Sequence, residues 1–170
     1  MASKSILKKF INLGPLILLY YLSISEIDSH FESYFEILSF SIQLIIIYFW
    51  VSKRPEVLGS GHIFLAGLLN DVVMGFPLGV SSLSYLVVSL VATYIKNMTV
   101  NTRITTDWFS FFIAIFFSNL IFFILLVNFS EIKIDLVEIS YNTFFTLLFF
   151  PFFWFLFTYY NTILTSGKNA

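Results

Sequence analysis

The chain has 170 residues, of which 58% are hydrophobic and 11% are charged, and its formal net charge is −1. Soluble proteins carry about 25% charged residues, so this composition indicates a membrane protein. No basic cluster exceeds two adjacent residues, which argues against nucleic acid as a partner. Because the chain has no cysteine, disulfides, thiolate catalysis and cysteine metal sites are excluded.

Apolar runs alternate with short polar connections along the whole chain, which predicts an all-α, polytopic membrane protein with a single transmembrane domain over residues 1–170. The first run follows a basic lead, as in a secretory signal peptide, but further apolar runs follow it and we expect an uncleaved span. The six predicted transmembrane segments cover about residues 10–24, 37–51, 61–75, 80–95, 108–127 and 136–160.

Lysine and arginine residues fall almost entirely on one side of this six-segment chain, which predicts that both termini are cytoplasmic. The other side holds only Lys133. The residues on the cytoplasmic side are Lys4, Lys8, Lys9, Lys53, Arg54, Lys96, Arg103 and Lys168.

The third segment is short. From Gly61 or His62, where we expect its helix to begin, to Gly75 is about 14 residues, or roughly 21 Å, against a hydrocarbon core of about 30 Å. Segments three and four are therefore predicted to form a short broken helix pair, either spanning fully or as a re-entrant hairpin. Small polar side chains of segment four would pack against segment three, namely Ser81, Ser82, Ser84 and Ser89.

Asp71 lies within segment three and has apolar sequence on both sides. An ionised aspartate near the bilayer centre costs about 2.5 to 3.5 kcal/mol on insertion scales, so a compensating interaction is required. Gly67, Asp71 and Gly75 recur every fourth residue and share one helix face, where the glycines let a neighbouring helix approach. Asn70 lies at the edge of that face.

The helix should end at Gly75, because glycine tolerates a left-handed terminus and Pro77 cannot continue the helical hydrogen bonds. A tight turn would then lead to Gly79. For the Asp71 carboxyl group we expect a hydrogen bond to Asn119 or to a serine of segment four. Alternatively, Asp71 is a functional residue that binds a proton, a ligand or a helix of a partner protein.

The order apolar-Gly-Leu-Leu-x-Asp-x-x-x-Gly-x-Pro-Leu-Gly, preceded by Lys53-Arg54-Pro55, resembles the MreD family of bacterial rod-shape-determining membrane proteins. The close match covers about residues 53 to 95. The resemblance implies a non-enzymatic scaffold in the cytoplasmic (inner) membrane that works with MreC in cell elongation. Through MreC it implies contact with the filament MreB and with the polymerase and transpeptidase of peptidoglycan synthesis. It also implies assembly through the motif residues Gly67, Asn70, Asp71, Gly75, Pro77 and Gly79.

A different class of function is also compatible with a carboxylate in a broken helix pair, namely a small-molecule or vitamin-capture subunit of a membrane transporter. Against it, no other predicted span holds an ionisable residue that would pair with Asp71. An intramembrane enzyme is the weakest alternative, because catalysis usually needs a second acid or base. We expect no cofactor.

His62 and His30 are predicted on opposite sides of the membrane, so they cannot share a metal ion, and we expect no metal site. Ser60 is predicted to cap the third helix. Two extracytoplasmic stretches are candidate docking surfaces, or extensions of spans into the headgroup region. They are formed by Phe31, Tyr34, Phe35 and Leu38, and by the alternating residues 131–136.

Overall fold

The computed structural model describes residues 2–25, 41–98, 103–129 and 136–166, and all regular structure in these ranges is helical. The all-α prediction is therefore confirmed for the described residues. Within the described ranges, six helices follow one another: α1 (Ala2–Ile24), α2 (Ile42–Lys53), α3 (Ser60–Met74), α4 (Val80–Met98), α5 (Ile104–Phe129) and α6 (Leu136–Ser166). Both docking stretches, except Leu136, and His30 lie outside the described residues.

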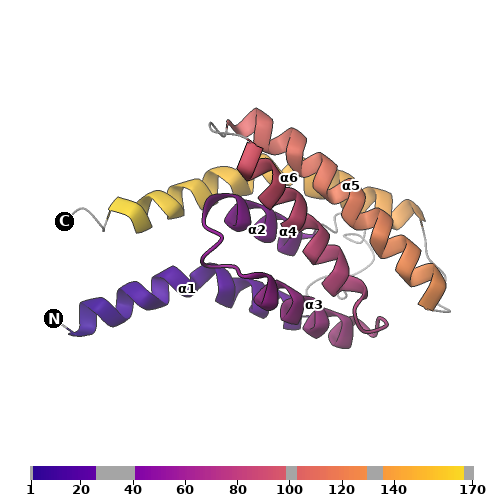
Figure 1. The fold of residues 1–170 in the computed structure, drawn as a ribbon, viewed down its shortest axis with the longest axis horizontal. Helices are drawn as coiled ribbons and strands as arrows, with labels where there is room; N and C mark the ends of the chain where they lie inside the picture. The colour runs from indigo at the N-terminus through magenta and orange to yellow at the C-terminus, as the bar shows by residue number, and fades with distance from the viewer. Residues whose placement is uncertain (1, 26–40, 99–102, 130–135, 167–170) are drawn as a thin grey trace, which may run out of the picture.

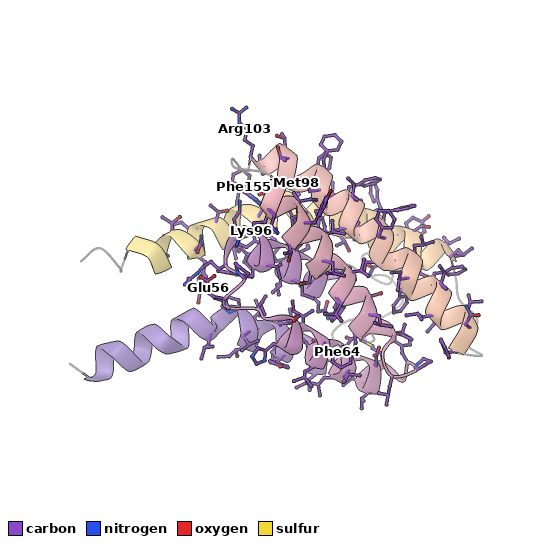
Figure 2. All side chains as sticks on the ribbon, in the orientation of Figure 1. Glu56, Phe64, Lys96, Met98, Arg103 and Phe155 are labelled. Atoms are coloured by element: carbon purple, nitrogen blue, oxygen red, sulfur yellow. The ribbon has the colours of Figure 1, made fainter. Side chains whose placement is uncertain are left out.

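The helices run back and forth between two ends of the molecule (Figure 1). The start of α1 and the end of α6 lie at one end, and the turn between α3 and α4 lies toward the other. Two basic side chains, Lys96 and Arg103, lie away from the turn between α3 and α4 (Figure 2).

α2 forms the centre of the bundle, and every residue from Gln43 to Ser52 is buried. Its apolar residues point in all directions, which is typical of a helix that is covered on every side. Aromatic rings join it to two neighbours: Tyr48 packs on Phe111 of α5 and Phe150 of α6 with centroids 5.2 and 5.8 Å away, and these two phenylalanines stack at 4.4 Å.

α5 and the part of α6 from Ile139 to Ile163 are long and apolar enough to cross a membrane. Shorter apolar helices cover Gly14–Ile24, α2 and α3. Only 33% of the most apolar window of α5 and 17% of that of α6 are buried. Both helices thus leave most of their apolar surface outside the protein core, which suits contact with lipid better than a soluble fold.

Two predictions about the ends of helices are wrong. The fourth segment, predicted to end at residue 95, continues as α4 to Met98, and the fifth, predicted to begin at residue 108, begins as α5 at Ile104. Asp107 is therefore a buried residue of the first turn of α5. The cap of α3 is Gly59, not Ser60: Ser60 is already helical, and no side chain makes the capping hydrogen bond.

Candidate functional site

The Asp71 carboxylate lies at the end of α3 and is completely buried. Its Oδ2 accepts the backbone N–H of Gly79 at 2.7 Å, and its Oδ1 accepts that of Ser81 at 2.8 Å. Both oxygens thus bind the first turn of the next helix, which begins at Val80. The carboxylate of one helix caps the N-terminus of its neighbour.

This cap satisfies two requirements at once. The N–H groups at the start of a helix have no partner within that helix, so without Asp71 those of Gly79 and Ser81 would lose their acceptors, and that of Ser81 is buried. The N-terminal end of a helix also carries partial positive charge, which stabilises an adjacent carboxylate. The compensation that the sequence requires for Asp71 therefore comes from backbone amides.

The backbone of Asp71 completes the turn from the other direction. Its carbonyl accepts the N–H of Gly75 and that of Phe76, the latter at 2.9 Å. Gly75 has φ = 69° and Gly79 has φ = 103°, values that favour glycine, so both residues are needed for their conformation. The predicted end of the helix at Gly75 is confirmed. Pro77 lies between them, and its carbonyl accepts the N–H of Val80 at 3.3 Å.

The backbones of α3 and α4 approach closely at Gly67. A Cβ atom built on it would lie 2.4 Å from the Cα of Ser82 and 2.6 Å from its N, so any side chain would push the two backbones apart. The Ser82 hydroxyl donates to the carbonyl of Phe64 at 3.1 Å, and Asn70 donates to the Ser81 hydroxyl at 3.0 Å. The predicted close approach is thus present at Gly67, whereas Gly75 has open space around it.

The predicted partners of Asp71 need correction. Asn119 of α5 does not contact Asp71 but donates to the Thr143 hydroxyl of α6 at 2.6 Å. The partner is a serine of α4, as predicted, but Ser81 donates its backbone N–H to Asp71 and not its hydroxyl. Ser84 packs away from α3: its hydroxyl and that of Ser118 donate to each other's backbone carbonyl at 3.0 and 3.1 Å.

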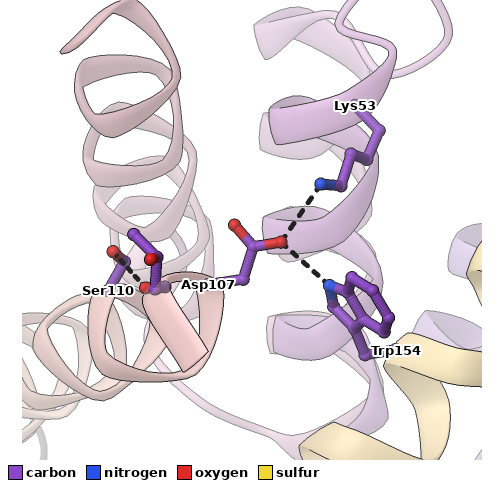
Figure 3. A network of polar contacts seen from close by, with 5 residues as sticks. Lys53, Asp107, Ser110 and Trp154 are labelled. Atoms are coloured by element: carbon purple, nitrogen blue, oxygen red, sulfur yellow. Dashed lines mark hydrogen bonds and ion pairs between the residues drawn. The ribbon is translucent and has the colours of Figure 1, made fainter. Parts of the chain in front are cut away.

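A second buried acid, Asp107, lies in the first turn of α5, and Figure 3 shows its contacts. Asp107 of α5 is 2% exposed, and its Oδ2 accepts the ammonium group of Lys53 at 3.1 Å and the indole N–H of Trp154 at 2.9 Å. The Lys53 ammonium also lies 5.8 Å from the centre of the Trp154 ring. One carboxylate therefore joins α2, α5 and α6.

No family model matches the sequence, and no curated protein or solved structure matches it either. The resemblance to the MreD family stays a prediction that rests on residues 53 to 95.

The Asp107 site was not predicted from the sequence, because its residues lie far apart in the chain. Lys53 and Trp154 are 54 and 47 positions from Asp107. The available signal was local: an acid directly before an apolar run suits the first turn of a helix, where it complements the helix dipole. That signal places Asp107 on α5 but does not identify its partners.

His62 lies at the start of α3 and is exposed, and its Nδ1 is 3.1 Å from the Tyr20 hydroxyl of α1. Among the described residues, no three histidine or acidic side chains lie close enough together to hold a metal ion. His62 thus contributes to the contact between α1 and α3.

Proposed function

We propose that this protein is a non-enzymatic membrane scaffold, a subunit of a bacterial cell-elongation complex that works with MreC. The observation that carries the proposal is the use of Asp71. It is the only charged residue between Glu56 and Lys96, and both of its oxygens are occupied by backbone N–H groups of the same hairpin. An acid occupied in this way shapes a helix pair, which is the work of a structural subunit.

Exposed apolar surface supports an assembly role. α5 and α6 expose large side chains along most of their length, so a single copy offers broad surfaces to lipid and to the helices of other membrane proteins. In the proposed complex, MreC would be the direct partner. MreB and the wall-synthesis polymerase and transpeptidase would be reached through it.

The proposed location is the cytoplasmic membrane with both termini in the cytoplasm. Lys53, Arg54, Lys96 and Arg103 all lie in or beside the connections between α2 and α3 and between α4 and α5. The end of α2, the end of α4 and the start of α5 lie away from the turn between α3 and α4, as do the start of α1 and the end of α6 (Figure 1). Basic residues are retained on the cytoplasmic side of membrane proteins, so this end would face the cytoplasm.

A small-molecule-capture subunit of a transporter is the second candidate function, and the hydrogen bonds of the Asp71 carboxylate argue against it. A ligand-binding acid in a broken helix pair needs an oxygen that is free to face the ligand. Asp71 is fully buried and uses one oxygen for each of two N–H donors. The resemblance to MreD and this geometry both favour the scaffold.

Affinity purification of the tagged full chain from the membranes of its host, in mild detergent, tests the proposal. We expect MreC and the wall-synthesis enzymes to co-elute. Recovery of the protein alone, or with an ATP-binding transporter pair, would contradict the scaffold function. Stabilisation of the pure protein by a small molecule, measured as a rise in Tm, would support the capture subunit instead.

Asp71→Asn tests whether the hairpin is needed for assembly. The amide keeps one acceptor oxygen but turns an NH₂ group toward a backbone donor, so one hydrogen bond is replaced by a repulsive contact. We expect reduced recovery of partners. Glu56→Gln is the matched control, because the Glu56 side chain is 65% exposed and lies outside the hairpin. Full recovery with Asp71→Asn at normal expression would remove Asp71 from the assembly role.

A further inference from the structure

The turn between α3 and α4 differs in composition from the other connections. It reads Gly75-Phe-Pro-Leu-Gly79 and has no charged residue, and the whole stretch 57–95 contains only Asp71. The connection after α2 carries Arg54 and Glu56, and residues 130–135 carry two acids and a lysine. Connections that reach water are polar as a rule, so this turn has the composition of a buried or lipid-facing segment.

Several backbone N–H groups around the turn have partners within the protein. Gly75 and Phe76 donate to the Asp71 carbonyl, and Gly79 and Ser81 donate to its carboxylate. Pro77 has no N–H group to satisfy. A turn in water can leave such donors to solvent, whereas a turn in hydrocarbon cannot, because each unpaired group costs several kcal/mol there. One aspartate accepting four backbone donors is an arrangement suited to a dry environment.

The register of the helices gives the depth of the turn. The Phe76 ring packs on Phe122 of α5 at 5.5 Å, and the paired hydrogen bonds of Ser84 and Ser118 fix α4 against α5. The turn therefore lies beside Phe122, seven residues before the end of α5 at Phe129. At 1.5 Å per residue, the turn stops about 10 Å short of that end.

The length of α5 allows the depth of the turn in the membrane to be estimated. From Asp107, which holds the ion pair with Lys53, to Phe129 is 22 residues, or about 33 Å, which matches a hydrocarbon core of about 30 Å. On this scale the turn lies about two-thirds of the way across. Its apolar surface is uncovered: Leu78 is 72% exposed at the tip, and Leu65, Leu69 and Val72 follow one another along the exposed face of α3.

We propose that α3 and α4 form a re-entrant hairpin. It enters from the basic end, its turn lies within the far half of the hydrocarbon core, and Leu78 contacts lipid acyl chains. The hairpin does not cross the membrane, so α3 and α4 would both open toward the basic end, whereas α5 is long enough to cross completely. This inference holds independently of the scaffold proposal, since it depends only on the register, the turn and its hydrogen bonds.

Spin-label depth measurements test the proposal directly, because the chain has no native cysteine. A nitroxide is attached at Leu78→Cys, Phe129→Cys or Ile124→Cys in the full chain, reconstituted in phosphatidylethanolamine–phosphatidylglycerol vesicles. All three positions are exposed, and Ile124 lies on α5 two residues beyond the level of the turn. Relaxation by oxygen reports the hydrocarbon, and relaxation by a water-soluble nickel chelate reports the aqueous phase.

We expect the Leu78 label to match the Ile124 label, with strong oxygen relaxation and weak nickel relaxation. The Phe129 label should show nickel relaxation several-fold stronger. Nickel relaxation at Leu78 as strong as at Phe129 would overturn the proposal and make α3 and α4 two full spans. Leu78→Trp, quenched by lipids brominated at known depths, repeats the comparison without a nitroxide. Quenching only by the shallowest bromines would likewise overturn the proposal.

Discussion

The two buried aspartates solve the same physical problem with different partners. Asp71 is compensated by backbone amides that lie 8 and 10 residues away in the chain. Asp107 is compensated by a lysine and a tryptophan from two other helices. The first arrangement shapes one hairpin, whereas the second holds three helices together near the basic end of the bundle.

Each acid therefore controls a different part of the bundle. Loss of the Asp71 carboxylate would leave two backbone donors at the start of α4 unpaired but would leave the contact among α2, α5 and α6 intact. Loss of Lys53 would leave the hairpin intact but would leave the buried Asp107 carboxylate without its cation. Substitutions at the two sites are expected to differ accordingly.

The largest effect is expected for Asp71→Lys. The substitution removes both acceptors and places an ammonium group against the positive end of α4, where the two remaining N–H donors alone cost about 1–3 kcal/mol each. We expect loss of the monodisperse peak in detergent size-exclusion chromatography and, if the scaffold proposal is right, loss of rod shape. Normal rods at unchanged expression would contradict the role of Asp71.

Lys53→Met should have the next largest effect. Among the described residues, it leaves the Trp154 indole as the remaining side-chain partner of the Asp107 carboxylate, which is 2% exposed. Breaking one side of a buried ion pair costs about 3–5 kcal/mol. The measurement is Tm in detergent, followed by tryptophan fluorescence.

The double variant Lys53→Met with Asp107→Asn is the control for this prediction. It removes both charges and keeps an oxygen that can accept the Trp154 N–H, so most of the lost stability should return. If the losses of the two single variants simply add, Lys53 and Asp107 do not act as a pair.

Gly67→Ala sharpens the view that the hairpin depends on close packing. Its Cβ would lie 2.4 Å from the Ser82 backbone, so α3 and α4 must separate, at a cost of about 1–3 kcal/mol. Gly61→Ala, in the first turn of the same helix, meets nothing within 4 Å and should be neutral or slightly stabilising. Equal Tm values for the two variants would show that the contact is not tight.

The difference between the two aspartates also explains what could be predicted from the sequence. The glycine spacing, the left-handed Gly75 and the turn at Pro77 are local features, so the hairpin and the location of Asp71 could be read from adjacent residues. The partners of the Asp71 carboxylate could not be predicted in this way. A buried acid is usually expected to bind side chains, and the N-terminus of α4 comes within its reach only after the turn has folded back.

The Asp107 site depends on tertiary structure throughout. A single acid near Trp108 reads as the polar end of a loop until α2 and α6 bring Lys53 and Trp154 beside it. The same limit applies to Asn119, whose predicted partner on α3 is replaced by Thr143 because α6, not α3, packs on that face of α5. The local hydrophobic pattern predicts the helices, but the side chains that pair between helices are known only from how the helices pack.

The smallest effect is expected at Glu56, which extends the comparison to an acid at the surface. A hydrogen bond from its own backbone N–H, followed by the neighbouring Arg54 guanidinium, lowers the pKa of this carboxyl group, and Arg54 Nε lies 3.2 Å from its Oε1. Because the folded-state pKa is below the unfolded one, the contribution to stability is present above the unfolded pKa, near 4.5. It is lost as the pH falls through the folded pKa.

Glu56→Gln should therefore lower Tm slightly at pH 7 and leave it equal to that of the unmodified chain at the lowest pH the folded protein tolerates. The side chain is 65% exposed, so solvent screens the interaction and the difference should be far smaller than that of Lys53→Met. A change in Tm as large as that of Lys53→Met would mean that solvent exposure does not weaken the Glu56 interaction. The buried Asp71 and Asp107 would then differ from Glu56 only in the groups that they bind.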